Sequence, residues 1–148
     1  MINNNDSLGK ALGFTLRMYS KKLQEMMEVE KIPLSVDQFI LLNIAHNHEN
    51  DITQVDLANF VGKDKSAVLR HIDYLEQIKL LGRREDVNDR RKKILTLTYK
   101  GEEMIKKGRV IEQKLTRAVM KGMTKPEVEH FMKTMNLILN NIYVLKNS

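Results

Sequence analysis

Small, basic and hydrogen-bonding side chains recur along one side of the stretch Asp64–Leu81 at the spacing of an α-helix. Ser66, Arg70 and Asp73 share that side, and Lys65 stands near its start. Such side chains could form hydrogen bonds with base edges. They suit a helix that lies in a DNA major groove with its N-terminal residues against the bases.

The other side of the same stretch is apolar. Val68, Ile72 and Leu75 recur there as a packed helix requires, and Asp64 is placed to accept from the free N–H groups of the first turn. Half-polar helices are common on protein surfaces, so the interpretation depends on the neighbouring segments.

Positive charge is concentrated immediately after this helix. The whole chain of 148 residues has 25 basic and 19 acidic side chains, a net charge of +6. An excess of four positive charges falls between Lys79 and Lys93, where the basic residues are Lys79, Arg83, Arg84, Arg90, Arg91, Lys92 and Lys93. A basic loop there could reach phosphates and the minor groove, although a solvated loop would have the same composition.

The preceding residues predict three helices. An amphipathic helix spans Ser7 to about Glu30, and Ser35 with Gln38 forms the capping box of a second. The spacing of Thr53 and Asp56 resembles another capping box, and the short helix that follows ends at Gly62. Followed closely by the helix at Asp64, it predicts a helix-turn-helix.

The following residues predict a β-hairpin and two long helices. Residues 82–86 and 93–98 have strand periodicity on either side of a polar turn at 87–92. Thr98 caps a helix that runs to about Lys121. Thr124, with Glu127 three residues later, starts the last helix, whose apolar residues follow a seven-residue repeat. A hairpin directly after a helix-turn-helix is the arrangement called a winged helix.

Composition excludes several other functions. There is no cysteine, which excludes disulfides, thiolate metal sites and thiol oxidation. His46 and His48, with Glu49 and Asp51 nearby, lack the usual metal-ligand spacing. No nucleophile–base or nucleotide-binding motif occurs, so we expect no enzyme, cofactor or metal. Without an apolar run or signal peptide, we expect a cytoplasmic protein with no membrane partner.

From Thr53 to Gly101 the chain resembles the MarR (multiple antibiotic resistance regulator) family of bacterial winged-helix transcription factors. The resemblance rests on four motifs: TQ-x-x-LA from Thr53, KS-x-V-x-R from Lys65, D-x-LE from Asp73, and D-x-x-DRR-x-x-x-L-x-LT-x-x-G from Asp86 to Gly101. The last motif is the most specific, whereas the first two also occur in other helix-turn-helix families. The flanking helices match in placement and length.

The resemblance implies roles for individual residues. It assigns Arg91 to the minor groove and Asp89 to holding that arginine. The wing set is Asp89, Arg90, Arg91, Lys92 and Lys93; the recognition set is Lys65, Ser66, Ala67, Arg70 and His71; and Thr53 and Gln54 meet phosphate. In the recognition set, arginine is the usual bidentate partner of guanine, serine serves either base type, and alanine can touch a thymine methyl.

Three positions depart from the family pattern. The family often has Thr at Ala67, Gly at Lys79 and Pro at Val87. The missing hydroxyl at Ala67 puts a base contact in doubt, and Lys79 removes the easy left-handed helix cap.

We therefore predict a mainly α fold with a small β-hairpin wing, one MarR-type domain over 1–148. Within it, a winged helix-turn-helix spans 32–98, and dimerisation helices span 7–30 and 99–146. The predicted function is sequence-specific binding of double-stranded DNA by a homodimer at a palindromic promoter site, as a repressor that a small-molecule effector releases. Two alternatives stay open at this point: a non-specific nucleic-acid-binding protein, and a helical ligand- or protein-interaction module.

Overall fold

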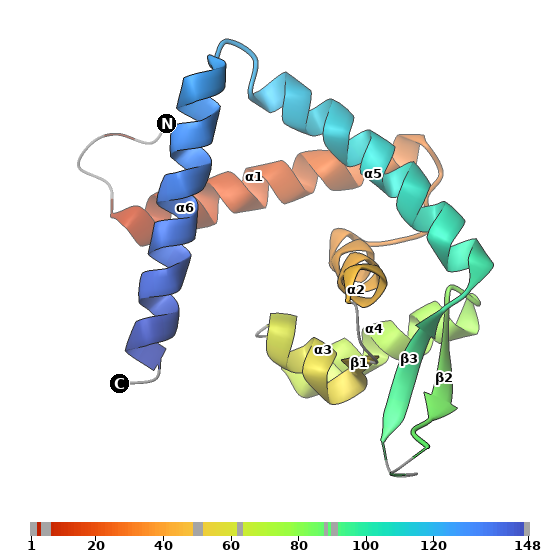
Figure 1. The fold of residues 1–148 in the computed structure, drawn as a ribbon. Helices are drawn as coiled ribbons and strands as arrows, with labels where there is room; N and C mark the ends of the chain where they lie inside the picture. Colours follow the sequence, from red (N-terminus) through yellow and green to blue (C-terminus); the bar gives the residue numbers. More distant parts are fainter. Residues whose placement is uncertain are drawn as a thin grey trace. The chain divides into compact units, whose positions relative to one another are not determined.

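The computed structural model describes residues 3, 7–48, 52–61, 64–87, 89 and 92–146 (Figure 1). The chain divides into two compact units, Met1–Gln113 and Lys114–Ser148, with the boundary inside the fifth helix. In chain order the elements are α1 (Leu8–Val29), α2 (Val36–Asn47), β1 (Ile52–Thr53), α3 (Gln54–Val61), α4 (Lys65–Gln77), β2 (Leu81–Glu85), β3 (Lys93–Leu97), α5 (Tyr99–Val119) and α6 (Lys125–Lys146). The predicted fold class, mainly α with a small hairpin wing, is confirmed.

A three-stranded antiparallel sheet supports the hairpin. The strand order is β1-β3-β2, with Arg83 opposite Leu95 in the hairpin and Ile52 opposite Leu95 on the other edge. The sequence analysis did not foresee β1, because two residues are too few to show a periodicity. Ile52 is buried, and β1 thereby ties the start of α3 to the hairpin.

Side-chain caps fix where the helices begin. Ser35 and Gln38 form the predicted capping box, and the Asp64 carboxylate accepts from the Ala67 N–H at 3.0 Å. At α3, Thr53 Oγ1 accepts from the Asp56 N–H at 3.2 Å, and the Asp56 carboxylate accepts from the Thr53 N–H at 3.0 Å. The unusual T-x-x-D box is therefore a real one.

The end of α4 corrects one expectation. Without glycine at position 79, we expected the left-handed helix cap to be lost. Lys79 nevertheless adopts the left-handed conformation, with φ of +61°. The Leu80 N–H donates to Leu75 O and the Lys79 N–H to Glu76 O, both at 2.9 Å, which is the Schellman arrangement. Leu80 is fully buried, and its packing in the core holds the Lys79 backbone in this conformation. Gly62, predicted to end α3, lies outside the described residues.

The core of the first unit lies among α2, α3, α4 and the sheet. The predicted apolar side of α4, Val68, Ile72 and Leu75, is buried, as are Leu57 of α3 and Ile94 of β3. Above this core, α5 packs closely on α2. A Cβ built on Gly108 would lie 2.2 Å from the Phe39 ring, so only glycine permits this approach.

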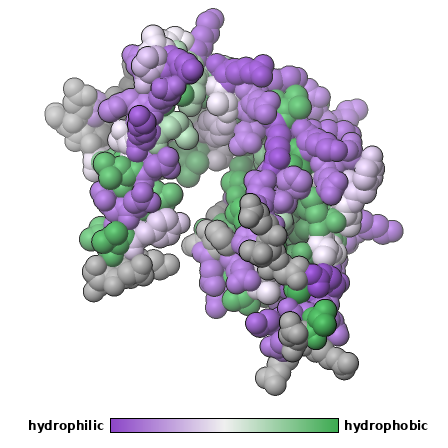
Figure 2. Space-filling model, viewed as in Figure 1, coloured by the Kyte–Doolittle hydropathy of each residue, from purple (hydrophilic) through white to green (hydrophobic). Residues whose placement is uncertain are grey.

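The predicted apolar stripes of the outer helices are buried only in part. We expected the apolar stripe of α1 to include Leu16, Leu23 and Met26. Leu23 is buried and Met26 is half-buried, whereas Leu16 is 65% exposed; the adjacent Met27 is buried instead. In α5, Ile111 and Leu115 are buried, whereas Val119, the last residue of the helix, is exposed. Hydrophobic side chains alternate with hydrophilic ones on the surface of α6 (Figure 2). Its exposed apolar residues include Phe131, Met132, Leu137, Leu139, Ile142, Tyr143, Val144 and Leu145.

Candidate nucleic-acid interface

Helix α4 presents the predicted recognition residues on its outer side. Lys65, Ser66 and Arg70 are exposed, and Ala67 and His71 are half-buried. Because Val68, Ile72 and Leu75 anchor the inner side, the helix cannot rotate without losing its core contacts. The exposed residues lie in the first two turns, which is the part of a recognition helix that meets base edges.

Leu69 adds an apolar group to the same helix. Its side chain is 38% exposed, and it lies one turn after Lys65 and one turn before Asp73. The sequence analysis left it out of the recognition set because periodicity alone does not tell an exposed leucine from a buried one at the edge of a helix face. An exposed leucine there is suited to contact with a thymine methyl group.

The N-terminus of α3 carries the predicted phosphate contacts. Thr53 Oγ1 donates its only proton to the Asp56 carboxylate at 2.6 Å, so in this structure the hydroxyl serves the cap. The hydrogen bonds from Thr53 lower the pKa of the Asp56 carboxyl below its ordinary 3.8, the side-chain bond most and the backbone bond next. Gln54 begins the helix, where the helix N-terminus itself favours an anion.

The wing is ordered by hydrogen bonds at its base. The Asp86 N–H donates to Lys92 O at 3.1 Å, and the Asp86 carboxylate accepts from the Asp89 N–H at 2.9 Å. Lys93 Nζ lies 2.7 Å from Glu85 Oε1 across the hairpin, while Lys92 is exposed. Arg90 and Arg91 lie outside the described residues.

Arg83, counted above among the basic residues of the wing, faces α4. Its Nη1 donates to the Glu76 carboxylate and its Nη2 to the Asp73 carboxylate. The side chain is only 23% exposed. The local charge excess therefore overstates the charge that this segment presents to solvent.

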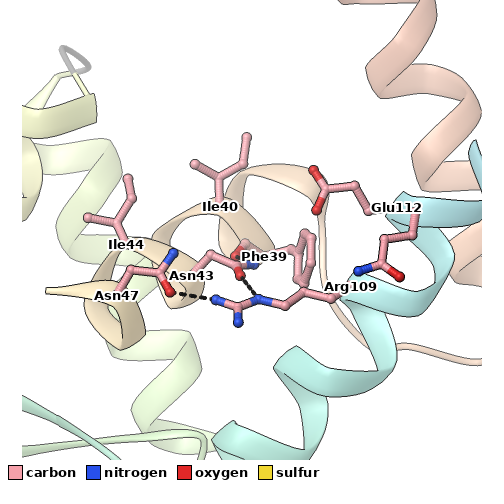
Figure 3. Close-up of a pocket in the computed structure, with 8 residues that line it drawn as sticks. Phe39, Ile40, Asn43, Ile44, Asn47, Arg109 and Glu112 are labelled. Carbon is pink, nitrogen blue, oxygen red and sulfur yellow. Dashed lines mark hydrogen bonds between the residues drawn. The ribbon is translucent and has the colours of Figure 1, made fainter. Parts of the chain in front are cut away.

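A pocket of about 470 Å³ opens between α2 and α5 (Figure 3). Arg109 reaches from α5 across to α2, where its Nε donates to Asn43 Oδ1 at 2.8 Å and its Nη2 to Asn47 Oδ1 at 2.6 Å. The sequence analysis missed this site. The i, i+4 spacing of the two asparagines puts them on one face of α2, but nothing in the sequence links them to an arginine 62 residues further along.

The rest of the pocket wall is part apolar and part polar. The wall includes the ring of Phe39, and Ile40 and Ile44 rise from α2 beside it, with Glu112 on the α5 side (Figure 3). The pocket thus combines three apolar side chains with one guanidinium, one carboxylate and three amide groups. Apolar surface beside a few polar groups that can fix a ligand's orientation is a feature of small-molecule sites. Elsewhere among residues 3, 7–48, 52–61, 64–87, 89 and 92–146, no cluster of three or more metal-ligating side chains occurs.

Comparison with known structures establishes the class of this fold. The chain is similar to the crystal structure of MarR at 24% identity, covering 99% of this chain and 98% of that one, with a TM-score of 0.87. It is also similar to MepR of S. aureus, solved as a DNA complex, at 18% identity, 93% and 99% coverage and a TM-score of 0.80. A third similar structure, BpsR of Bordetella bronchiseptica, concerns regulation of its DNA binding by 6-hydroxynicotinic acid (20% identity, 93% and 96% coverage, TM-score 0.78). The chain thus has a winged helix-turn-helix fold.

The central region of this fold also matches a sequence family. Residues 34–93, from the start of α2 to the start of β3, match the model of the MarR family. The resemblance predicted from the motifs is confirmed: residues 34–93 match the MarR family model, and the chain has the fold of MarR. Across the part of the chain that the structure describes, no helix combines the length and apolar character needed to cross a membrane.

Proposed function

We propose that this protein is a sequence-specific, double-stranded DNA-binding transcription regulator that represses by occupying a promoter site. The observation that carries the proposal is the exposed N-terminal half of α4, with Lys65, Ser66 and Arg70 held outward by a fully buried inner side. Lys92 of the wing adds an exposed positive charge, and α3 adds the partial positive charge of its N-terminus at Gln54. The structure of MepR with DNA supports the same use of this fold.

One titration tests this proposal against its alternatives. Fluorescence anisotropy would compare a duplex from the upstream region of the protein's own gene with a scrambled duplex at several salt concentrations. We expect a preference of roughly a thousandfold and a log–log salt slope of about −7 if a dimer makes on the order of eight phosphate contacts. Equal affinity for both duplexes would indicate a non-specific nucleic-acid binder. No binding to either would indicate an interaction module.

The residue roles inside the interface remain proposals. We assign base contacts to Lys65, Ser66, Ala67, Arg70 and His71 of α4. The wing set Asp89, Arg90, Arg91, Lys92 and Lys93 is assigned to phosphates and the minor groove. Within it, Arg91 enters the groove, Asp89 holds that arginine, and Lys92 meets phosphate. Thr53 and Gln54 are also assigned to phosphate. The Thr53 hydroxyl proton is donated to the Asp56 carboxylate. We therefore expect the hydroxyl to donate to a phosphate only if its hydrogen bond to Asp56 breaks. Arg91→Ala should weaken operator binding strongly and leave oligomeric state unchanged, whereas unchanged affinity would refute the wing role.

A homodimer is the assembly we propose, with a palindromic operator as its consequence. The N-terminal half of α1 and most of α6 expose apolar side chains, among them Leu16 and Leu145, that an isolated chain leaves in water. A two-fold dimer would place two copies of α4 about one turn of B-DNA apart, on two related half-sites.

Oligomeric state can be tested with one substitution in an exposed stripe. Leu16→Glu should give monomers in sedimentation equilibrium, because a dimer that covers this stripe would have to remove the glutamate charge from water. The helical circular dichroism spectrum should stay unchanged, because the same side chain is in water in the monomer. Val87→Glu is the matched control, since Val87 is 90% exposed on the wing and should not affect dimerisation. A dimer of unchanged affinity in the Leu16 variant would exclude the α1 stripe from the interface.

We further propose that a small anionic or aromatic effector acts through the pocket between α2 and α5. Arg109 supplies the positive charge and Phe39 the aromatic wall. The regulation of BpsR by 6-hydroxynicotinic acid makes that compound a reasonable first probe. Calorimetric titration should give binding to the wild type that Arg109→Gln abolishes. Equal binding by both proteins would move the effector elsewhere.

A further inference from the structure

Arg83 joins the wing to the recognition helix. It lies in the middle of β2, opposite Leu95 of β3, and its guanidinium bridges Asp73 and Glu76, which lie three residues apart on α4. Its Nε is buried and makes no hydrogen bond to any described residue, so the ion pairs are the polar contacts that hold the group in place. A planar guanidinium suits this task because it offers two donors in a fixed fork.

This geometry is unlike that of a phosphate contact. Phosphate-binding cations need an exposed head, but the Arg83 side chain is 23% exposed and both of its terminal nitrogens donate to carboxylates. Asp73, by contrast, is 62% exposed on the side of α4 that carries Ser66 and Arg70. A carboxylate there would repel DNA unless its charge is compensated.

We propose that Arg83 is a positioning residue for DNA recognition: it fixes the wing to α4 so that groove and wing contacts form in one register. This inference rests on the proposed DNA-binding function. The ion pairs with Asp73 and Glu76 hold β2 in a fixed position against the recognition helix. The preference for the operator depends on that fixed position. Arg83 itself contacts no phosphate.

The proposal and simple electrostatics differ in what they predict for the preference between operator and scrambled duplex. Changing Asp73→Asn together with Glu76→Gln removes two negative charges from a DNA-facing helix. Charge alone would then strengthen binding to every duplex. Positioning adds a second effect: the double variant should bind scrambled duplex at least as well as wild type, yet lose about tenfold of its preference for the operator.

The experiment uses the full chain and the duplex that the wild type enriches from a randomised library, with a scrambled duplex as reference. Anisotropy at several salt concentrations gives affinity and salt slope for wild type, Arg83→Gln, Arg83→Lys and the double acid variant. Lys92→Gln is the control for a phosphate contact. We expect Arg83→Gln to lose about tenfold in preference with an unchanged salt slope, and Arg83→Lys, which keeps the charge but not the fork, to lose an intermediate amount. Lys92→Gln should reduce the slope by about 0.9 per contact and weaken both duplexes alike.

Two results would overturn the proposal. A salt slope that falls in Arg83→Gln as it does in Lys92→Gln would make Arg83 a phosphate contact. An undiminished preference in the double acid variant would show that the ion pairs position nothing. Thermal unfolding identifies variants that fail to fold; if Arg83→Gln is among them, the double acid variant, which keeps the arginine, decides the question. If the wild type enriches no duplex, the proposed DNA-binding function is contradicted. That outcome differs from both results above, which concern only the role of Arg83.

Discussion

Replacing Lys79 by glycine should stabilise the protein. Lys79 is held at φ of +61°, a conformation that costs an L-residue about 1–2 kcal/mol and costs glycine nothing. Glycine gives back about 0.5–1 kcal/mol through the greater freedom of the unfolded chain. The difference predicts that Lys79→Gly raises the free energy of unfolding by about 0.5–1 kcal/mol. The bond from Thr98 Oγ1 to Lys79 O, at 2.7 Å, uses only backbone on the Lys79 side and survives the change.

The chain offers two matched controls for the same substitution. Lys31 has φ of +55° at the end of α1, so Lys31→Gly should also stabilise. Lys107 is exposed within α5, where glycine costs about 0.5–1 kcal/mol, so Lys107→Gly should destabilise. Urea unfolding followed by circular dichroism at one protein concentration measures all three, with melting temperatures expected to move by about 2 °C. Destabilisation of all three variants alike would refute the reasoning from backbone conformation.

Three further predictions concern the core, a cap and the interface. Gly108→Ala should destabilise by about 1–2 kcal/mol, because its methyl group would overlap the Phe39 ring and the gain in helix propensity offsets only part of the strain; an unchanged unfolding midpoint would contradict that packing. NMR titration should find the pKa of Asp56 below 3.8, and Thr53→Ala should bring it back toward that value. Since folding lowers this pKa, the cap contributes stability above pH 3.8 and loses that contribution as the pH falls through the pKa of Asp56 in the folded protein. A pKa of Asp56 that Thr53→Ala leaves unchanged would exclude the cap as the cause of the shift. Arg70→Ala should cost about 1–3 kcal/mol in operator binding and relax preference at one base pair, whereas equal losses on every duplex would make Arg70 a phosphate contact.

Local signals in the sequence predicted most element boundaries. The caps at Ser35, Asp64 and Thr98 involve partners three residues away, so their spacing alone places the helix starts. The apolar side of α4 was likewise visible as a period of 3.6. What these signals share is that each depends on neighbours within one turn of helix.

Features that depend on distant partners could not be predicted. The Arg109 contacts join residues 62 and 66 positions apart, and β1 exists only because Ile52 meets Leu95. The sequence also marked Leu16 as apolar without showing whether anything in the same chain covers it. The left-handed backbone at Lys79 was missed because local propensity argues against it and tertiary packing of Leu80 overrides that propensity.

Thr98 joins β3, α5 and the turn between α4 and β2. Its N–H donates to Leu80 O at 3.1 Å, its hydroxyl donates to Lys79 O, and the same oxygen accepts from the Gly101 N–H at 3.0 Å. It is also the single residue between β3 and α5. The hairpin consequently has no flexible linker between β3 and α5. Because Thr98 is also bonded to Lys79 and Leu80, we expect a tilt of α5 to move the end of α4 and the hairpin together. In the homodimer proposed above, we expect a tilt of α5 to change the distance between the two copies of α4.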